Sequence, residues 1–232
     1  MQRGRIKRGF NNYIQNGLSM DKQTWIAFML FVFVSMAVFG FFVEITFYHF
    51  NSIVLYKKSE WFWRGNAFGP WIDIYGIGSV LVFALTYKVR SKPWLVALIS
   101  GALLSVIELV AGMAIYYLDN GRREWNYNEE MLTIGNIGGF LCGRNIIAFC
   151  VAGPFLMYLV VPIILWLRSK MSRKVFLAIG FAIGGICIAD MFYNVVVSNI
   201  IPGCRRAGEI YKDIGFKFVK FTQHDKAFWK LK

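Results

Sequence analysis

The chain has 232 residues, of which 57% are hydrophobic and only 17% are charged, and its net charge is +13. A soluble domain has about a quarter of its residues charged, and here the apolar residues lie in runs long enough to cross a membrane. Composition therefore excludes a soluble globular domain and predicts an all-α, polytopic integral membrane helical bundle. Because the basic residues flank the apolar runs, we expect contacts with anionic membrane lipids and no binding of nucleic acid.

In chain order, a basic N-terminal arm occupies residues 1–23 and a transmembrane bundle occupies residues 24–202. The bundle should contain about five transmembrane helices, or six, and the five apolar runs are 24–50, 70–87, 94–118, 143–167 and 175–201. The rest of the chain, residues 203–232, is a basic tail with apolar residues at near-helical spacing. This spacing predicts an amphipathic helix at the membrane interface.

Two glycine-rich stretches do not fit simple membrane helices. Residues 64–78, RGNAFGPWIDIYGIG, contain four glycines, a proline and an acid, which favours a structured loop and helix start that builds part of a polar site. The alternative is a turn with an aromatic belt at the membrane interface. Residues 131–142 are apolar but too short to span, so they predict a re-entrant segment or half helix.

Orientation follows from the lysines and arginines near the ends of the apolar runs. Twelve lie on the side of the N-terminal arm and the two short turns, and six lie on the side of the first and third loops. We therefore predict a multi-pass protein of the cell (plasma) membrane with a cytoplasmic N-terminus. Five spans would then place the basic tail outside, in conflict with its charge.

Four acids lie in or beside the apolar runs, namely Glu44, Asp73, Glu108 and Asp190. At about 1.5 Å per helical residue, all four fall in the half of the membrane that faces the first and third loops. An acid at a helix centre costs about 2.5–3.5 kcal/mol, so such residues usually face a partner or a cavity. The same half contains the other polar candidates: Arg64, Tyr75, Trp125, Tyr127, Asn136, Arg144 and Asn194.

These residues have two interpretations, a buried network that only fixes helix packing or a site for a substrate. We expect Arg64 to pair with Glu44, Asp73 or Glu108, because a buried charge needs compensation. We also expect Glu108 and Asp190 to line one cavity, because their depths match. No Walker A, HExxH or GxSxG motif is present, so we assign no catalytic residue and expect no cofactor or metal.

With these positions in hand, the chain resembles the bacterial family of type IV ABC-transporter permeases, over roughly residues 35–195. The most specific part of the resemblance is the stretch 64–78, where the family has an arginine–glycine pair, a Gly-Pro step and an IYG segment. The remaining similar positions are Glu44, Glu108, Trp125 with Asn126 and Tyr127, Asn136 with Gly139, Val161 with Pro162, and Asp190. Asn126 stands where the family has an acid.

The resemblance implies a transporter-like membrane protein, a permease or the membrane subunit of a transport system, in which the acidic residues bind a cationic or proton-coupled solute. The two short basic turns offer little surface for a separate ATPase subunit. One alternative is an intramembrane enzyme for a lipid or lipid-linked substrate, with Glu108 or Asp190 as general base and an arginine holding phosphate. Another is a scaffold for a partner protein. A partner subunit or a homo-oligomer fits the first and the last of these readings.

The charge asymmetry gives a topology prediction that single-cysteine variants can test in intact cells. Arg90→Cys should resist a membrane-impermeant thiol reagent, because the turn that contains it is predicted to be cytoplasmic. Labelling of this variant from outside would contradict the orientation. Labelling of Lys226→Cys from outside would show that the tail is translocated.

Overall fold

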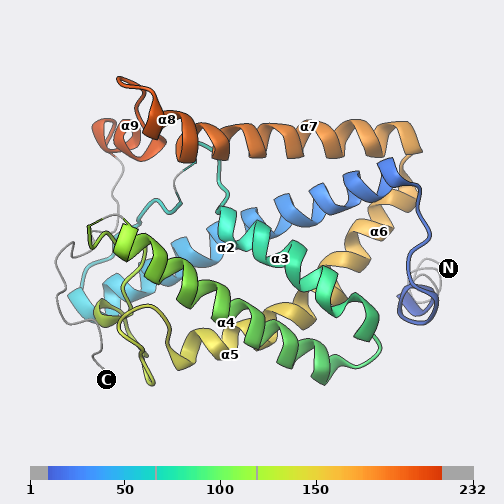
Figure 1. Ribbon diagram of the computed structural model, residues 1–232, viewed down its shortest axis with the longest axis horizontal. Coiled ribbons are helices and arrows are strands. Elements are labelled where there is room, and N and C mark those ends of the chain that lie inside the picture. Colours follow the sequence, from blue (N-terminus) through green and yellow to red (C-terminus); the bar gives the residue numbers. More distant parts are fainter. Residues whose placement is uncertain (1–9, 66, 119, 216–232) are drawn as a thin grey trace.

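The computed structural model describes residues 10–65, 67–118 and 120–215, and these ranges fold as a bundle of helices without a β-sheet (Figure 1). A helical turn at residues 10–16 comes first. The α-helices that follow are α2 (Lys22–Tyr56), α3 (Asp73–Thr86), α4 (Pro93–Leu118), α5 (Gly143–Phe155), α6 (Val161–Lys170), α7 (Arg173–Phe192), α8 (Ser198–Ile200) and α9 (Ala207–Asp213). The shorter elements are the 3-10 helices η1 (Tyr87–Val89) and η2 (Tyr127–Glu129) and the π-helices η3 (Leu156–Val160) and η4 (Tyr193–Val197).

Four helical stretches are long and apolar enough to cross a membrane, namely Lys22–Tyr56, Pro93–Leu118, Gly143–Lys170 and Arg173–Val197. The predicted all-helical membrane fold is confirmed to this extent. The helix expected at 70–87 is shorter than predicted, since α3 has 14 residues. Its expected first turn is extended instead, because Ile72 N donates a hydrogen bond to the carbonyl of Ala37 on α2 at 3.1 Å.

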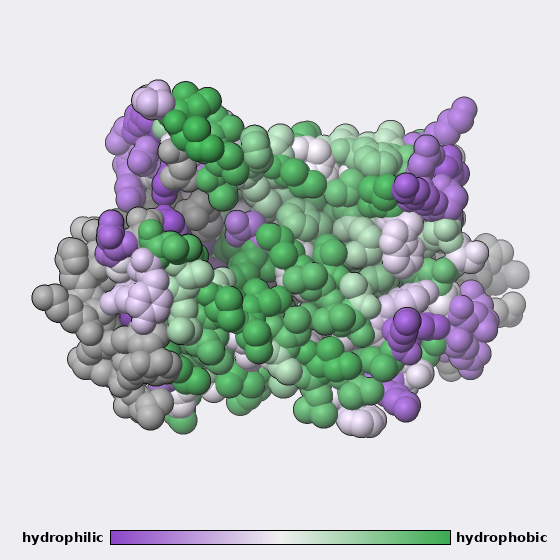
Figure 2. Space-filling model, in the orientation of Figure 1, coloured by the Kyte–Doolittle hydropathy of each residue, from purple (hydrophilic) through white to green (hydrophobic). Residues whose placement is uncertain are grey.

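The long helices run side by side, so the molecule has two polar ends separated by an apolar band (Figure 2). One end carries the short turns between η1 and α4 and between α6 and α7, together with residues 10–16, and we name it the turn end (Figure 1). The opposite end carries the loops 57–72 and 119–142 together with α9, and we name it the loop end. Every residue of the candidate polar site lies towards the loop end.

Helix α2 is the longest element, with 35 residues instead of the 27 predicted at 24–50. Its length is about 52 Å, well beyond the roughly 30 Å of a bilayer core. The additional turns carry polar contacts to both loops: Ser52 Oγ donates to the carbonyl of Lys58 at 2.6 Å, and Asn51 Oδ1 accepts from Met131 N at 2.9 Å. The end of α2 is therefore a support on which the loops are built.

Residues 131–142 were predicted to form a re-entrant segment or a half helix. The half helix is wrong, because this stretch consists of turns with one isolated bridge between Ile137 and Leu141. Polar side chains form hydrogen bonds with backbone N–H and C=O groups that would pair with each other in a helix. Asn136 Oδ1 accepts from Gly139 N at 2.8 Å, and Arg123 Nη1 donates to the carbonyl of Gly138 at 2.9 Å. Such side-chain contacts compete with helix formation. Gly139 also has φ +81°, a value that glycine adopts without strain.

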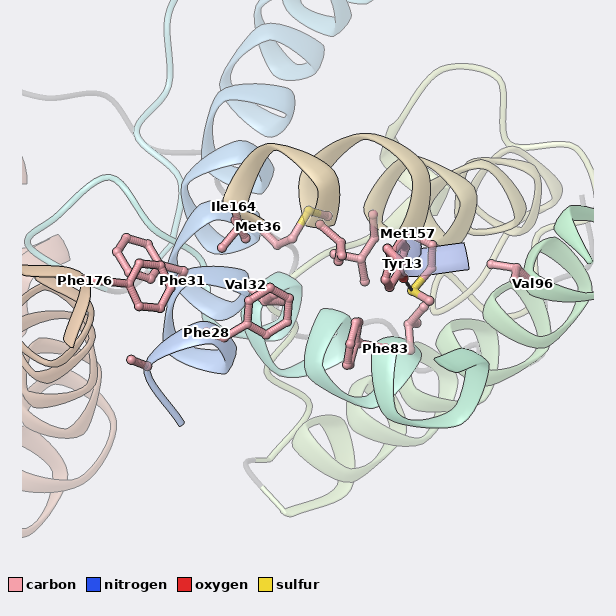
Figure 3. Close-up of a cluster of buried hydrophobic side chains, with 14 residues drawn as sticks. Tyr13, Phe28, Phe31, Val32, Met36, Phe83, Val96, Met157, Ile164 and Phe176 are labelled. Carbon is pink, nitrogen blue, oxygen red and sulfur yellow. Dashed lines mark hydrogen bonds between the residues drawn. The ribbon is translucent and has the colours of Figure 1, made fainter. Parts of the chain in front are cut away.

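The apolar core lies nearer the turn end and joins all the long helices (Figure 3). Phe28 and Phe31 on α2 pack against Phe83 on α3 and Phe176 on α7, and the Phe31 and Phe176 rings stack at 4.6 Å. The N-terminal turn joins this core through Tyr13, whose side chain is 1% exposed and lies beside Met157 of η3. Tyr13 therefore anchors the described part of the N-terminal arm in the apolar core, with Ile14 and Leu18 packed beside it.

The basic tail is described only as far as residue 215, and the remainder of the predicted amphipathic helix lies outside the described residues. Its first part forms α9 at the loop end, where Tyr211 donates to the carbonyl of Phe68 at 2.6 Å. The start of the tail is thus at the end of the molecule opposite to residues 10–16 (Figure 1). Residues 1–9 of the N-terminal arm also lie outside the described part.

We predict that Tyr13→Ala lowers the free energy of unfolding by about 3 kcal/mol, because it removes a fully buried aromatic ring. Tyr13→Phe should stay within about 1 kcal/mol of the wild type, because the hydroxyl donates to a sulfur atom, a weak acceptor, at 3.7 Å. Thermal unfolding in detergent would measure both variants. Equal stability of Tyr13→Ala and the wild type would contradict the assigned packing.

Candidate functional site

Arg64, in the loop after α2, forms an ion pair with Glu44 on α2. Its Nε donates to Glu44 Oε2 at 2.6 Å, and the two side chains are only 11% and 19% exposed. The Arg64 guanidinium also lies 4.3 Å from the ring centre of Tyr48, one helical turn after Glu44. The predicted pairing of Arg64 with an acid of the bundle is confirmed by this contact. Burial by itself would lower the pKa of Arg64, but Glu44, Tyr48 and Glu130 together raise it above its usual value.

Tyr75 of α3 also lies next to this ion pair and interacts with Glu44. Its ring lies directly over Gly40, one turn before Glu44, and a Cβ atom at Gly40 would be 2.2 Å from Tyr75 Cγ. Only glycine allows α3 to approach α2 so closely. This glycine therefore sets the position of the IYG segment relative to Glu44.

A second ion pair joins the loop 119–142 to α5. Arg144 Nη2 donates to Glu130 Oε2 at 2.7 Å, and Arg144 Nη1 donates to the carbonyl of Met131 at 2.8 Å. The hydroxyl of Tyr48 donates to the other oxygen of Glu130. Burial raises the pKa of Glu130, against the opposite effect of these two hydrogen bonds. Because Tyr48 touches both Arg64 and Glu130, the two ion pairs form one continuous network.

Glu108 on α4 is the third acid of this network. Its Oε1 accepts hydrogen bonds from the hydroxyl of Tyr127 and from Asn145 Nδ2, the latter at 3.1 Å. Asn145 in turn accepts from Arg144 Nε at 3.0 Å, which links Glu108 to the second ion pair. Burial raises the pKa of Tyr127 well above its usual value, so the phenol keeps its proton and donates. The residues Glu44, Arg64, Tyr75, Glu108, Tyr127 and Arg144 are thus brought together by the fold.

Asp190 belongs to a separate cluster on the opposite side of the loop 57–72. Its carboxylate accepts from Phe68 N at 3.0 Å, Gly69 N at 2.8 Å and Trp71 Nε1 at 2.9 Å. Asn194, in η4, donates to Asp190 Oδ1 at 2.7 Å and accepts from Ala207 N at 2.7 Å. These contacts fasten the loop and α9 to α7.

The structure does not bring Glu108 and Asp190 into one cavity, since each binds a different set of partners. Helix α4 packs against α5 and α3, whereas α7 packs against α2. A small pocket near Asp190 is lined by Ala67, Trp71, Asp73, Met191, Asn194 and Val195. Matched depth along two helices gave no information on whether the helices were neighbours.

The other three candidates have local partners. Asp73 begins α3 and accepts from Ile74 N at 2.8 Å. Trp125 Nε1 donates to the carbonyl of Phe140 at 3.0 Å, and Asn136 binds Asn128 and the backbone of Gly139. Trp125 and Asn136 therefore stabilise the loop 119–142 and reach the network only through that loop.

Sequence reasoning missed three members of the network, namely Tyr48, Glu130 and Asn145. Glu130 ends a polar stretch that is typical of an exposed loop, yet its side chain is 4% exposed. A signal for Tyr48 was available, because residues four apart lie on one helix face and Glu44 precedes it by four. Asn145 follows Arg144 directly, and no sequence spacing indicated that it would reach Glu108.

We predict that Arg64→Met lowers the free energy of unfolding by about 3 kcal/mol, because Glu44 would remain as a buried charge without its partner. Glu44→Gln should lower the free energy of unfolding by a similar amount, because Arg64 would then be the buried charge without a partner. The double variant should be more stable than the sum of the two single effects predicts, because neither uncompensated charge remains. Chemical unfolding in detergent would measure this double-mutant cycle.

Arg205→Gln is the matched control, because its pair with Asp213 is exposed and should contribute less than about 1 kcal/mol. Additive effects of Arg64→Met and Glu44→Gln would contradict a structural role for the buried pair. Unchanged stability with lost activity would assign Arg64 to a ligand instead.

Comparison with known proteins gives a family for the chain. The family described as "Putative ABC-transporter type IV" matches residues 31–195, well over half of the sequence. This range includes both ion pairs, Glu108 and Asp190. No curated protein and no solved structure was found to match. The expected resemblance is therefore confirmed, and the chain belongs to the ABC-transporter type IV family of membrane proteins.

Proposed function

We propose that the protein is a permease, or the membrane subunit of a transport system, which handles a cation or a proton-coupled solute at its buried charge network. The observation that supports this proposal is one network at the loop end of three acids and two arginines from α2, α4, α5 and two loops. Hydrogen bonds and the cation–π contact between Arg64 and Tyr48 connect its members. Ionisable groups are rare inside membrane proteins, and they commonly mark ion or proton pathways. Family membership supports transport as the general process.

The contacts favour transport over an intramembrane enzyme. An enzyme for lipid phosphates would need an available arginine, but Arg64 and Arg144 are each paired with a carboxylate. It would also need a general base, yet both oxygens of Asp190 already accept hydrogen bonds from the loop. Glu108 is hydrogen-bonded through Oε1 and has no nucleophilic serine or cysteine bonded to it in the described part of the chain.

The cellular setting is part of the same proposal. We place the protein in the bacterial cell membrane as a multi-pass protein, with the turn end cytoplasmic and its basic residues against anionic headgroups. Lys88, Lys92, Arg168, Lys170 and Lys174 gather there, which suits a negatively charged leaflet. The turns at this end are short, so an ATPase partner would need the N-terminal arm or a second copy of the chain for docking.

Glu108→Gln tests the proposal, because it removes the network's ionisable group on α4 while it preserves side-chain size. In proteoliposomes, we expect cation flux or pH-driven solute flux to fall at least tenfold, while extracted lipids remain chemically unchanged by mass spectrometry. The matched control is Glu124→Gln, an acid of the same loop end whose partner is the nearby Arg122.

An intramembrane enzyme would give the opposite pair of results. Its lipid substrate would be converted by the wild type and would accumulate unmodified with Glu108→Gln, while flux would not change. If neither flux nor lipid composition responds to Glu108→Gln, the network is structural and the scaffold interpretation holds.

A further inference from the structure

One buried oxygen atom in the network has no hydrogen-bond partner among the residues that the structure describes. The side chain of Glu108 is almost fully enclosed, with the residue 7% exposed, and its Oε1 accepts two hydrogen bonds. Its Oε2 is buried and has no hydrogen-bond partner within the described ranges. The other network acids differ, because Glu44 accepts from Arg64 and Glu130 accepts from Arg144 and Tyr48.

The charges around Glu108 are also unbalanced. Each arginine of the network is engaged by another carboxylate, and the side chain of Arg144 reaches Asn145 rather than Glu108. The titratable or charged groups that surround Glu108 come from α2, α3, α5 and the loop 119–142, and they are Glu44, Tyr75, Cys142, Arg144, Tyr127 and Glu130. An ionised Glu108 would make three carboxylates against two arginines.

The two protonation states of Glu108 differ in cost. A buried carboxylate with one oxygen lacking a donor loses hydration without replacement, and the nearby Glu44 and Glu130 repel it. A neutral carboxylic acid removes the repulsion and reduces the hydration cost to that of one buried hydroxyl, and it still accepts two hydrogen bonds through its carbonyl oxygen. The proton would then reside on Oε2, the oxygen that no donor occupies.

We propose that Glu108 is a proton-binding site, occupied in this conformation and emptied when water reaches Oε2. Release moves the Oε2 proton to the entering water and leaves a carboxylate, which Tyr127 and Asn145 stabilise through Oε1. The third carboxylate then attracts a cation to the network. This inference rests on the proposed function for its transport consequence and deepens it by naming the proton as the coupling ion.

Infrared difference spectroscopy on the full chain in proteoliposomes tests the resident proton. With glutamate labelled by 13C at the carboxyl group, a protonated glutamic acid band should be present at neutral pH and disappear at higher pH. Glu108→Gln should remove this band, and Glu124→Gln should leave it unchanged. Glu108→Gln should also keep the wild-type melting temperature at neutral pH, because a neutral amide resembles a neutral acid.

Tyr127→Phe is a second variant that keeps the ring and removes the hydroxyl donor. The loss of a hydrogen bond that favours the carboxylate should shift the disappearance of the band upward by about one pH unit. This shift distinguishes Glu108 from any other protonated glutamate, even if Glu108→Gln fails to fold.

The results separate the inference from the proposed function. Absence of a protonated glutamic acid band throughout the pH range, or a band insensitive to both Glu108→Gln and Tyr127→Phe, would overturn the inference even if solute flux were intact. A band that responds as predicted supports the proton site, and flux without any response to a pH gradient would then count against proton coupling in the proposed function.

Discussion

The ion pair between Arg64 and Glu44 is the interaction on which the arrangement of the loop end depends. An arginine and a glutamate with little exposure stabilise a fold only when each compensates the other, because either one alone would be a buried charge. The pair fixes the loop 57–72 to α2. Through Tyr48 it also fixes the position of Glu130, and through Glu130 the position of α5. One electrostatic requirement thus organises two loops and two helices.

The length of α2 and the attachment of the loop 57–72 to α7 both help to place Arg64 beside Glu44. Helix α2 continues beyond the length of a membrane crossing, so that its last turns lie beneath both loops. Asp190 on α7 binds the loop 57–72 by accepting hydrogen bonds from the backbone amides of Phe68 and Gly69. The loop is therefore held between α2 and α7, and its arginine has a defined position without regular secondary structure. The π-helices η3 and η4 interrupt the helices α5–α6 and α7, and such interruptions are frequent at functional sites.

Much of the fold followed from composition and hydropathy, because long apolar runs have few alternatives to membrane helices. The same reasoning failed for residues 131–142, where Asn136 and Arg123 take the backbone hydrogen-bonding groups that a helix would use. Hydropathy does not register such contacts. It also overestimated α3, because the start of that run is bound to α2 and α7 in an extended form.

For the site, depth along each helix identified the acids and arginines that share one end of the bundle, and the pairing of Arg64 was predicted correctly. Depth could not show that Asp190 belongs to a separate cluster from Glu44 and Glu108, because this depends on which helices are neighbours. Glu130 and Asn145 were missed for a related reason. Their burial results from the path of the loop 119–142, which no sequence periodicity encodes. The paired acids and arginines could thus be expected from the sequence, whereas the unpartnered oxygen of Glu108 could not.

Solid-state NMR of the protein in lipid bilayers would measure the central interaction directly. With 15N-labelled arginine side chains and 13C-labelled glutamate carboxyl groups, dipolar dephasing reports short nitrogen–carbon distances, and 15N–31P dephasing reports contact with lipid phosphate. The structure predicts strong 15N–13C dephasing that decreases in Glu44→Gln, with little 15N–31P dephasing at Arg64. Strong 15N–31P dephasing that is lost in Arg64→Met, together with unchanged 15N–13C dephasing in Glu44→Gln, would show that Arg64 binds lipid phosphate and would contradict the network described here.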